Sequence, residues 1–252
     1  MPEKIDLLTG IQCVSSALRQ VPEQVLRVYV SKQSQNRRVF ELVDIARTRG
    51  IPVEMLDREE INKKCDFERN QDILAGFTPA NLYTDKDLDK LLASIDGDPL
   101  LLVLDGVQDP HNLGACLRTA SSAGVHAVIL PKDRSASITP VVRRAAAGAA
   151  EIIPVVFVTN LARTLKMLKK AGVWLYGTDE QADAVIYETS LTGPLALVMG
   201  SEGTGMRRLT AENCDYQFHI PMTGSISSLN VSVATGVCLF EICRQRGAVL
   251  DD

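Results

Sequence analysis

The 25 residues between Asp215 and Glu241 contain no charged side chain. This run includes Pro221, Gly224 and four serines. A membrane-spanning helix needs about 20 predominantly apolar residues whose backbone groups are all hydrogen-bonded, so this composition argues against one. We expect instead a loop that leads into a buried helix whose polar end faces a ligand.

We also expect no secretory signal, because residues 1–13 contain Glu3 and Asp6 and no apolar segment. The six cysteines include no Cys-x-x-Cys pair, and a disulfide framework is not expected in a reducing cytoplasm. Cys214 and His219 come nearest to a metal pair, but they lack companions at ligand spacing. The sequence therefore predicts a cytoplasmic protein with buried thiols, no metal site and no membrane contact.

The composition is that of an ordinary globular protein, with 46% hydrophobic and 23% charged residues in a chain of 252 that can hold two modest domains. The net charge of −4 gives no general attraction to nucleic acid. Basic residues cluster at Lys32, Arg37 and Arg38 and again at Lys63 and Lys64. A solvated helical face is one interpretation of these clusters, and a surface that follows RNA phosphates is the other.

The distribution of apolar residues divides the chain into two α/β domains. Residues 1–78 predict a small one, in which short apolar runs alternate with a helical pattern. Residues 79–97 are Asp-rich and polar and predict a linker. In residues 98–252 apolar strands alternate with helices, which predicts a mostly parallel sheet covered on both faces. From this alternation alone we expect an unknotted, Rossmann-like domain.

The first candidate site segment is residues 109–118, which follow a predicted strand at 100–104. Turn-forming residues place Asn112 near a helix N-terminus, with Arg118 further along the helix. The residues three and four positions from Arg118 are small, so its guanidinium has room for a ligand. The alternative for Arg118 is a solvated or ion-paired surface charge.

The second candidate is the glycine-rich segment 200–205, directly after a predicted strand at 195–199. It matches neither the Walker loop nor the dinucleotide fingerprint. A glycine loop at the carboxyl end of a strand brings backbone N–H groups against a ligand, although ordinary turns use glycine as readily. Glu202 is unusual inside such a loop, and a solvated acid is its plainer interpretation.

The third candidate lies within the uncharged run, where Ser228 and Asn230 precede a helix that extends to about Arg244. Capping of that helix is a sufficient structural explanation for Ser228. The amide of Asn230 must find hydrogen-bond partners or remain open to a ligand. Apolar residues cover much of the helix circumference, as in a helix buried in a core or a subunit interface.

These three segments, in this order, resemble the SpoU (TrmH-type) branch of the SPOUT RNA 2′-O-ribose methyltransferases. The matching motifs are Asn112-x-Gly114-x-x-x-Arg118, Gly200-x-Glu202-Gly203-x-Gly205 and Ser228-Leu229-Asn230-Val231-Ser232. The resemblance covers residues 98–246. Residues 1–78 resemble, more loosely, the ribosomal-protein-L30e-like RNA-binding domain of the same enzymes, with Asn70-Gln71-Asp72 where these relatives usually show His-Gln-Gly.

The resemblance implies a C-terminal SPOUT domain with a deep trefoil knot, in place of the unknotted topology, and a homodimer with its active site near the subunit interface. It implies transfer of a methyl group from S-adenosyl-L-methionine to the ribose 2′-hydroxyl of a guanosine in 23S ribosomal RNA. Three residues would hold the cofactor, largely through backbone groups: Gly200, Ile220 and Leu229. Five would form the reaction site: Arg118, Glu202, Ser228, Asn230 and Asn112.

The family mechanism makes Arg118 the base, yet a guanidinium has a pKa above about 12 and is normally protonated. As a base, Arg118 would have to lose its proton in a dry, cationic site. If it stays protonated, it would instead stabilise the developing alkoxide or orient a substrate phosphate. A different RNA, such as transfer RNA, is an alternative substrate. A noncatalytic RNA-binding module would not need the three motifs, and a nucleotide-dependent oxidoreductase would need a Gly-x-Gly-x-x-Gly segment that the first helix lacks.

Overall fold

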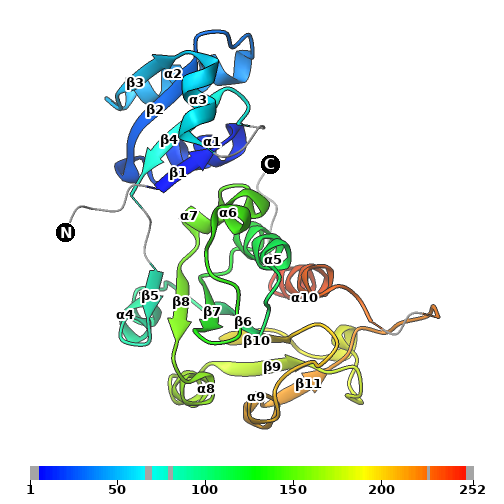
Figure 1. The fold of residues 1–252 in the computed structure, drawn as a ribbon. Helices are drawn as coiled ribbons and strands as arrows, with labels where there is room; N and C mark the ends of the chain where they lie inside the picture. The colour runs from blue at the N-terminus through cyan, green and yellow to red at the C-terminus, as the bar shows by residue number, and fades with distance from the viewer. Residues whose placement is uncertain (1–5, 66–69, 79–81, 226–227, 248–252) are drawn as a thin grey trace. The chain divides into compact units, whose positions relative to one another are not determined.

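The computed structural model describes residues 6–65, 70–78, 82–225 and 228–247. The chain divides into two compact units (Figure 1). The first consists of Met1–Asn81 with Ile138–Ile152, and the second of Leu82–Ser137 with Ile153–Asp252. Each unit contains one β-sheet.

The first unit is built on a four-stranded sheet in the order β1-β4-β2-β3. β4 pairs antiparallel with β1 and β2, whereas β2 and β3 are parallel. Its strands are β1 (Asp6–Thr9), β2 (Val25–Ser31), β3 (Val53–Leu56) and β4 (Ile73–Phe77). Its helices are α1 (Ile11–Gln20), η1 (Pro22–Gln24), α2 (Arg37–Thr48), α3 (Arg58–Lys64), α6 (Pro140–Ala146) and α7 (Ala149–Ile152).

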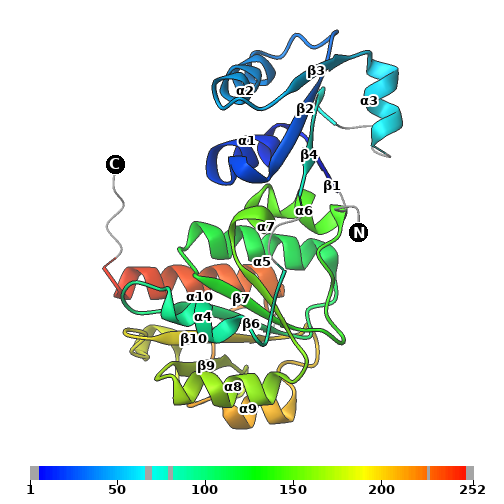
Figure 2. The same cartoon turned by 90° about the vertical axis from the view of Figure 1, so that its left-hand side faces the viewer.

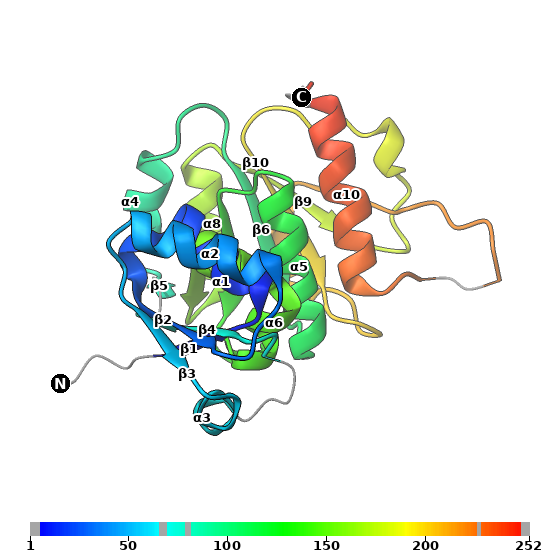
Figure 3. The ribbon, with the colours of Figure 1, turned by 90° about the horizontal axis from the view of Figure 1, so that it is seen from above.

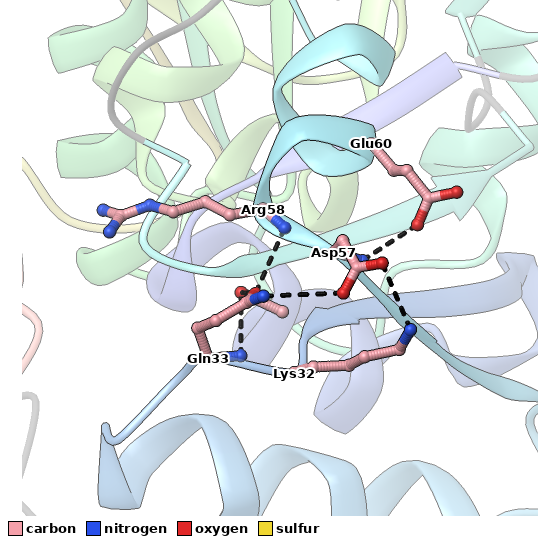
Figure 4. Close-up of polar contacts among 6 residues, drawn as sticks. Lys32, Gln33, Asp57, Arg58 and Glu60 are labelled. Carbon is pink, nitrogen blue, oxygen red and sulfur yellow. Dashed lines mark hydrogen bonds and ion pairs between the residues drawn. The ribbon is translucent and has the colours of Figure 1, made fainter.

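A polar network fastens the start of α3 to the end of β2 (Figure 4). Gln33 Oε1 accepts the backbone N–H of Arg58 at 3.1 Å, and Lys32 Nζ lies 3.3 Å from Asp57 Oδ2. Glu60 completes a capping box with Asp57, since its carboxylate accepts the N–H of Asp57 at 2.9 Å. The charge of Lys32 is thus matched by a carboxylate, which favours the solvated-face interpretation at this position.

The second unit is built on a seven-stranded sheet in the order β11-β9-β10-β6-β7-β8-β5, in which all paired strands are parallel. Its strands are β5 (Leu82–Thr84), β6 (Leu100–Asp105), β7 (Ala127–Pro131), β8 (Val155–Val158), β9 (Trp174–Thr178), β10 (Leu195–Gly200) and β11 (Tyr216–Phe218). Its helices are α4 (Leu88–Ala93), α5 (Pro110–Ser122), α8 (Leu161–Lys170), η2 (Ile186–Glu188), α9 (Arg208–Asn213) and α10 (Val231–Gln245). The predicted parallel α/β architecture is confirmed.

Helices cover both faces of this larger sheet (Figure 2). α5 and α10 pack side by side on one face (Figure 3), and α8 and α9 lie on the other. The central strands are fully buried and almost entirely apolar, with Asp105 at the end of β6 as the charged exception, as expected for a parallel sheet with two covered faces. None of the described helices combines the length and the apolar composition needed to cross a bilayer.

Two segments differ from the domain plan expected from the sequence. Part of the expected linker at residues 79–97 belongs to the second unit. β5 pairs with β8, and Leu88 of α4 is buried in the core of that unit. Residues 79–81 lie outside the described residues. Polarity alone predicted a linker, but an edge strand and a short amphipathic helix are polar on their outer sides.

The second difference is that residues 138–152, expected in the larger domain, belong to the first unit. Arg143 of α6 is buried and forms ion pairs with Glu151 and with Asp6, the latter at 3.4 Å. The Cys13 thiol of α1 also donates to the Arg143 carbonyl oxygen at 3.8 Å. The contacts of Arg143 with Asp6 and with Cys13 join positions more than 100 residues apart, so no local pattern predicts them.

Candidate active site

The candidate site lies at the carboxyl ends of β6 and β10, which are adjacent parallel strands with Gly200 opposite Asp105 in register. α5 follows β6, and its N-cap Asp109 accepts the N–H of His111 at 3.1 Å. α10 is capped by Asn230, whose Oδ1 accepts the N–H of Ser232 at 2.9 Å. The cap of α10 is thus Asn230 and not Ser228, because the helix begins one residue after Asn230.

One side chain from each predicted motif meets in a hydrogen-bonded cluster. Glu202 Oε1 accepts the amide of Asn112 at 2.8 Å and the amide of Asn230 at 2.7 Å. Asn230 Nδ2 also lies 3.0 Å from Asn112 Oδ1. Asn230 and Glu202 are exposed and Asn112 is half-buried, so the cluster is accessible from solvent.

The glycines of the second motif are required by the shape of the loop. The loop leaves β10 at Gly200 and folds back, and the N–H groups and carbonyls of Ser201 and Gly205 bond each other at 3.0 Å. A Cβ at Gly200 would clash with the backbone of Gly205 and Met206. Gly205 itself has a φ of +64°, in the left-handed region. This folding back carries Glu202 toward Asn112 and Asn230.

A cleft of about 930 Å³ borders the cluster. The three predicted cofactor residues, Gly200, Ile220 and Leu229, all line it. Glu202, Ser228 and Asn230 line it as well. Its volume is within the range of small-molecule sites, about 300–1,000 Å³.

Asn112 and Arg118 are not among the lining residues. Asn112 is nevertheless joined to the site by its hydrogen bond to Glu202. Arg118 is exposed on α5, and its backbone carbonyl accepts the Ser122 hydroxyl at 3.0 Å. The structure thus brings four of the five predicted reaction-site residues to the cleft or its bordering cluster and places Arg118 outside that group.

The carboxyl end of β9 contributes a wall of the cleft that the sequence analysis missed. Residues 178–181 line the cleft together with the glycine loop. Ser232, which belongs to the third motif but was not predicted as a site residue, donates its hydroxyl to Asn230 Oδ1 at 2.6 Å. The rule that ligands bind at the carboxyl ends of parallel strands gives a signal for residues 178–181, because they follow a strand beside β10.

Cys214 and His219, the nearest approach to a metal pair in the sequence, are engaged in structural contacts. His219 Nδ1 lies 2.8 Å from the Ala182 carbonyl oxygen, and Cys214 Sγ lies 3.4 Å from that of Thr210. Burial raises the pKa of the Cys214 thiol to about 12. Within the described residues, no group of three or more His, Cys, Asp and Glu side chains is arranged to hold a metal ion.

Family models and relatives match nearly the whole chain. Residues 99–240 match the SpoU rRNA Methylase family, and residues 7–83 match the RNA 2′-O ribose methyltransferase substrate binding domain. The 23S rRNA (guanosine-2′-O-)-methyltransferase RlmB of Escherichia coli (strain K12) is 49% identical over 241 residues, which cover 96% of this chain and 99% of the relative. RlmB of Pasteurella multocida (strain Pm70) is 54% identical over 238 residues, covering 94% and 97%.

A solved structure supports the same assignment. The SpoU methyltransferase AviRb from Streptomyces viridochromogenes, in complex with the cofactor AdoMet, superposes with a TM-score of 0.78 at 25% identity. The superposition covers 97% of this chain and 91% of AviRb. With its three motifs gathered around one cleft and both of its parts matched, the chain belongs to the SpoU rRNA methylase family.

Proposed function

We propose that this protein is an S-adenosyl-L-methionine-dependent methyltransferase that methylates the ribose 2′-hydroxyl of a guanosine in 23S ribosomal RNA. The observation that carries the proposal is the convergence of Asn112, Glu202 and Asn230 beside a nucleoside-sized cleft. The RlmB relatives carry the name of this reaction at about half identity over almost the full chain. Because the substrate is ribosomal RNA, we place the activity in the cytoplasm.

The residues around the cleft fit the proposed cofactor. Gly200, Ile220 and Leu229 contribute to its wall, and the missing Cβ at Gly200 lets the backbone of Gly205 and Met206 return against this part of the wall. When bound, S-adenosylmethionine supplies an electrophilic methyl group. The chain's task is then to orient the ribose hydroxyl, exclude water and stabilise the oxygen as its proton is lost.

The roles of Glu202 and Ser228 follow from their contacts and positions, and the role of Arg118 is the one that the family resemblance implies. Glu202 holds the amides of Asn112 and Asn230 through a single oxygen and fixes their orientation. Ser228 lines the cleft and offers a hydroxyl to ribose or cofactor. Arg118 acts on the 2′-oxygen, either as an unusually deprotonated base or by stabilising the alkoxide with its positive charge.

The two parts of the chain divide the work. We assign residues 1–78 to an L30e-like domain that binds the RNA substrate, in agreement with the substrate-binding match at 7–83. The second unit, Leu82–Ser137 with Ile153–Asp252, forms the methyltransferase domain and contains most of the SpoU match at 99–240. We infer that this domain contains the deep trefoil knot, since the insertion of β10 between β6 and β9 is compatible with that path.

We infer that the protein is a homodimer through α10. Val233 and Phe240 lie seven positions apart on this helix, so they share one face, and each is 52% exposed. Large apolar side chains on one helix face are stabilised when a second copy covers them. This assembly would bring Arg118 on the adjacent α5 close to the interface.

Methyl transfer to defined RNAs tests the proposed function. Purified protein is incubated with methyl-tritiated S-adenosylmethionine and 23S ribosomal RNA from a strain that lacks the gene, with transfer RNA in parallel. We expect label in 23S RNA only, at a guanosine whose 3′-phosphodiester bond resists alkaline hydrolysis. Label in transfer RNA alone would reassign the substrate, and a protein that binds RNA but transfers no label would be a noncatalytic module.

A further inference from the structure

Asp105 is a buried carboxylate directly behind the glycine loop. It ends β6, its side chain has no exposed surface, and its partner in the adjacent strand is Gly200, where the loop begins. It is not among the residues that line the cleft. Burying a carboxylate is unfavourable unless the charge is paired and hydrogen-bonded, so the contacts of Asp105 indicate what holds it there.

Both contacts are made to Arg207. Asp105 Oδ2 accepts the backbone N–H of Arg207 at 2.9 Å, whereas Oδ1 accepts no hydrogen bond from the described residues and lies 3.4 Å from Arg207 Nε as an ion pair. Arg207 is the first residue after the segment 200–206, and all of that segment lines the cleft. The carboxylate at the end of one strand thus fastens the far end of a loop that starts from the neighbouring strand.

The return of the loop also depends on close packing by Met206. A Cβ on Gly177 of β9 would lie 2.6 Å from Met206 Cε, so this glycine leaves space for the thioether. Met206 and Arg207 are therefore held from two sides, by β9 and by Asp105. Glu202, which accepts the amides of Asn112 and Asn230, lies between the two fastened ends of the loop.

We propose that Asp105 is a positioning residue for the methyltransferase site. It acts through the backbone N–H of Arg207 to hold the loop 200–207 in its closed form, the folded-back conformation in which Ser201 and Gly205 bond each other. The inference rests on the proposed function, since it takes this loop as the cofactor wall. When the closed form is only partly populated, the apparent Kd for cofactor rises in proportion. Asp105 thus controls the affinity for the cofactor and the placement of Glu202, although it does not line the cleft itself.

A pair of substitutions at Arg207 isolates the hydrogen bond. The φ of Arg207 is −63°, which matches the value of about −65° that proline imposes. Arg207→Pro therefore removes the N–H with this φ retained, whereas Arg207→Ala removes the side-chain ion pair and retains the N–H. Both substitutions remove the ion pair, so the difference between them reports the N–H alone. We expect the Kd for S-adenosylmethionine to be about tenfold higher in Arg207→Pro than in Arg207→Ala, as for loss of one charge-assisted hydrogen bond.

Substitutions at Asp105 complete the test, measured by isothermal titration calorimetry on the full-length protein. Asp105→Ala is expected to weaken cofactor binding at least as much as Arg207→Pro, and Asp105→Asn to weaken it less, because its amide oxygen still accepts the N–H. Val103→Ala, buried on the same strand, is the control for stability and is expected to lower Tm without changing the Kd. Arg208→Ala, whose side chain pairs with Glu212 away from the loop, is the surface control.

Each outcome decides the inference. A folded Arg207→Pro protein with the wild-type Kd, or equal weakening by Arg207→Pro and Arg207→Ala, would overturn the role of the N–H. A rise in Kd for Val103→Ala as large as that for Asp105→Ala would reduce Asp105 to a general stabilising residue. If Asp105→Ala does not fold, the Arg207 pair still gives the answer. Failure of the wild-type protein to bind S-adenosylmethionine would overturn the proposed function itself.

Discussion

The amide of Asn230 donates to Glu202 Oε1 at 2.7 Å, although 28 residues separate them in the chain. The same oxygen accepts the amide of Asn112, which lies on another helix. One carboxylate oxygen thus determines how two amides at the edge of the cleft are oriented. The contribution of each partner can be separated by substitution.

Glu202→Gln is expected to lower kcat by about 10²-fold. The glutamine presents either an NH₂ group or a weaker acceptor to the amides of Asn112 and Asn230, and either change disturbs their alignment. Glu212→Gln is the matched control, since Glu212 is an exposed acid paired with Arg208 at 2.6 Å. Steady-state kinetics and thermal unfolding of both variants check the prediction. Equal activity of the two variants would remove Glu202 from the site.

Asn230→Asp and Asn230→Ala separate helix capping from positioning. Aspartate retains the oxygen that caps α10 but places a second carboxylate against Glu202, whereas alanine loses the cap at a cost of about 1 kcal/mol. We expect turnover to fall at least about tenfold in both, because aspartate repels the Glu202 carboxylate and alanine removes the amide that donates to it. The expected loss of stability in urea unfolding is smaller for aspartate. An active Asn230→Asp protein with normal cofactor affinity would show that the missing charge in this segment is incidental.

Arg118→Ala is expected to reduce single-turnover methyl transfer by about 10²–10³-fold, as for loss of one group that stabilises a developing oxyanion. Cofactor affinity and Tm should stay at wild-type values, because Arg118 is exposed and does not line the cleft. Arg118→Lys retains the charge without the planar fork, so partial activity in this variant favours electrostatic stabilisation. Wild-type rates in Arg118→Ala would exclude Arg118 from the reaction.

Phe240→Glu is expected to convert the proposed dimer into a monomer in sedimentation velocity, because it places a charge within the apolar face of α10. Leu209→Glu is the control, since Leu209 is a similarly exposed apolar residue, on α9, and its substitution should leave the oligomeric state unchanged. A wild-type protein that sediments as a monomer at all concentrations would contradict the assignment of α10 as an interface.

The stability of the protein is expected to depend on the ionisation of Glu241 at acidic pH. Hydrogen bonds from Arg244 and Gln245 lower the pKa of this carboxyl from 4.5 to about 2. A pKa that is lower in the folded state stabilises the fold above the unfolded-state pKa, and this contribution is lost as pH falls from 4.5 toward 2. Urea unfolding should therefore show a flatter pH dependence for Glu241→Gln over this interval. Parallel curves for both proteins would contradict it.

The parallel sheet and the three motif segments could be predicted from sequence because their signals are local. Buried strands are continuous apolar runs, and the glycine loop and the segment 109–118 each follow such a run directly. The position of β10 beside β6 then brings Asn112 and Glu202 together. Ser228 was favoured as the cap of α10 because the exact helix start depends on packing, and the structure assigns that role to Asn230.

By itself the sequence determined the α/β class, the order of the motifs and the identity of the polar side chains that can serve a methyl transfer. Only the tertiary structure decided that residues 82–84 form an edge strand, that residues 138–152 pack in the first unit and that Asp105 holds the end of the glycine loop. The reason is physical. Hydrophobic periodicity reports which face of a segment is buried, whereas a hydrogen bond between residues 102 positions apart depends on which strands become neighbours.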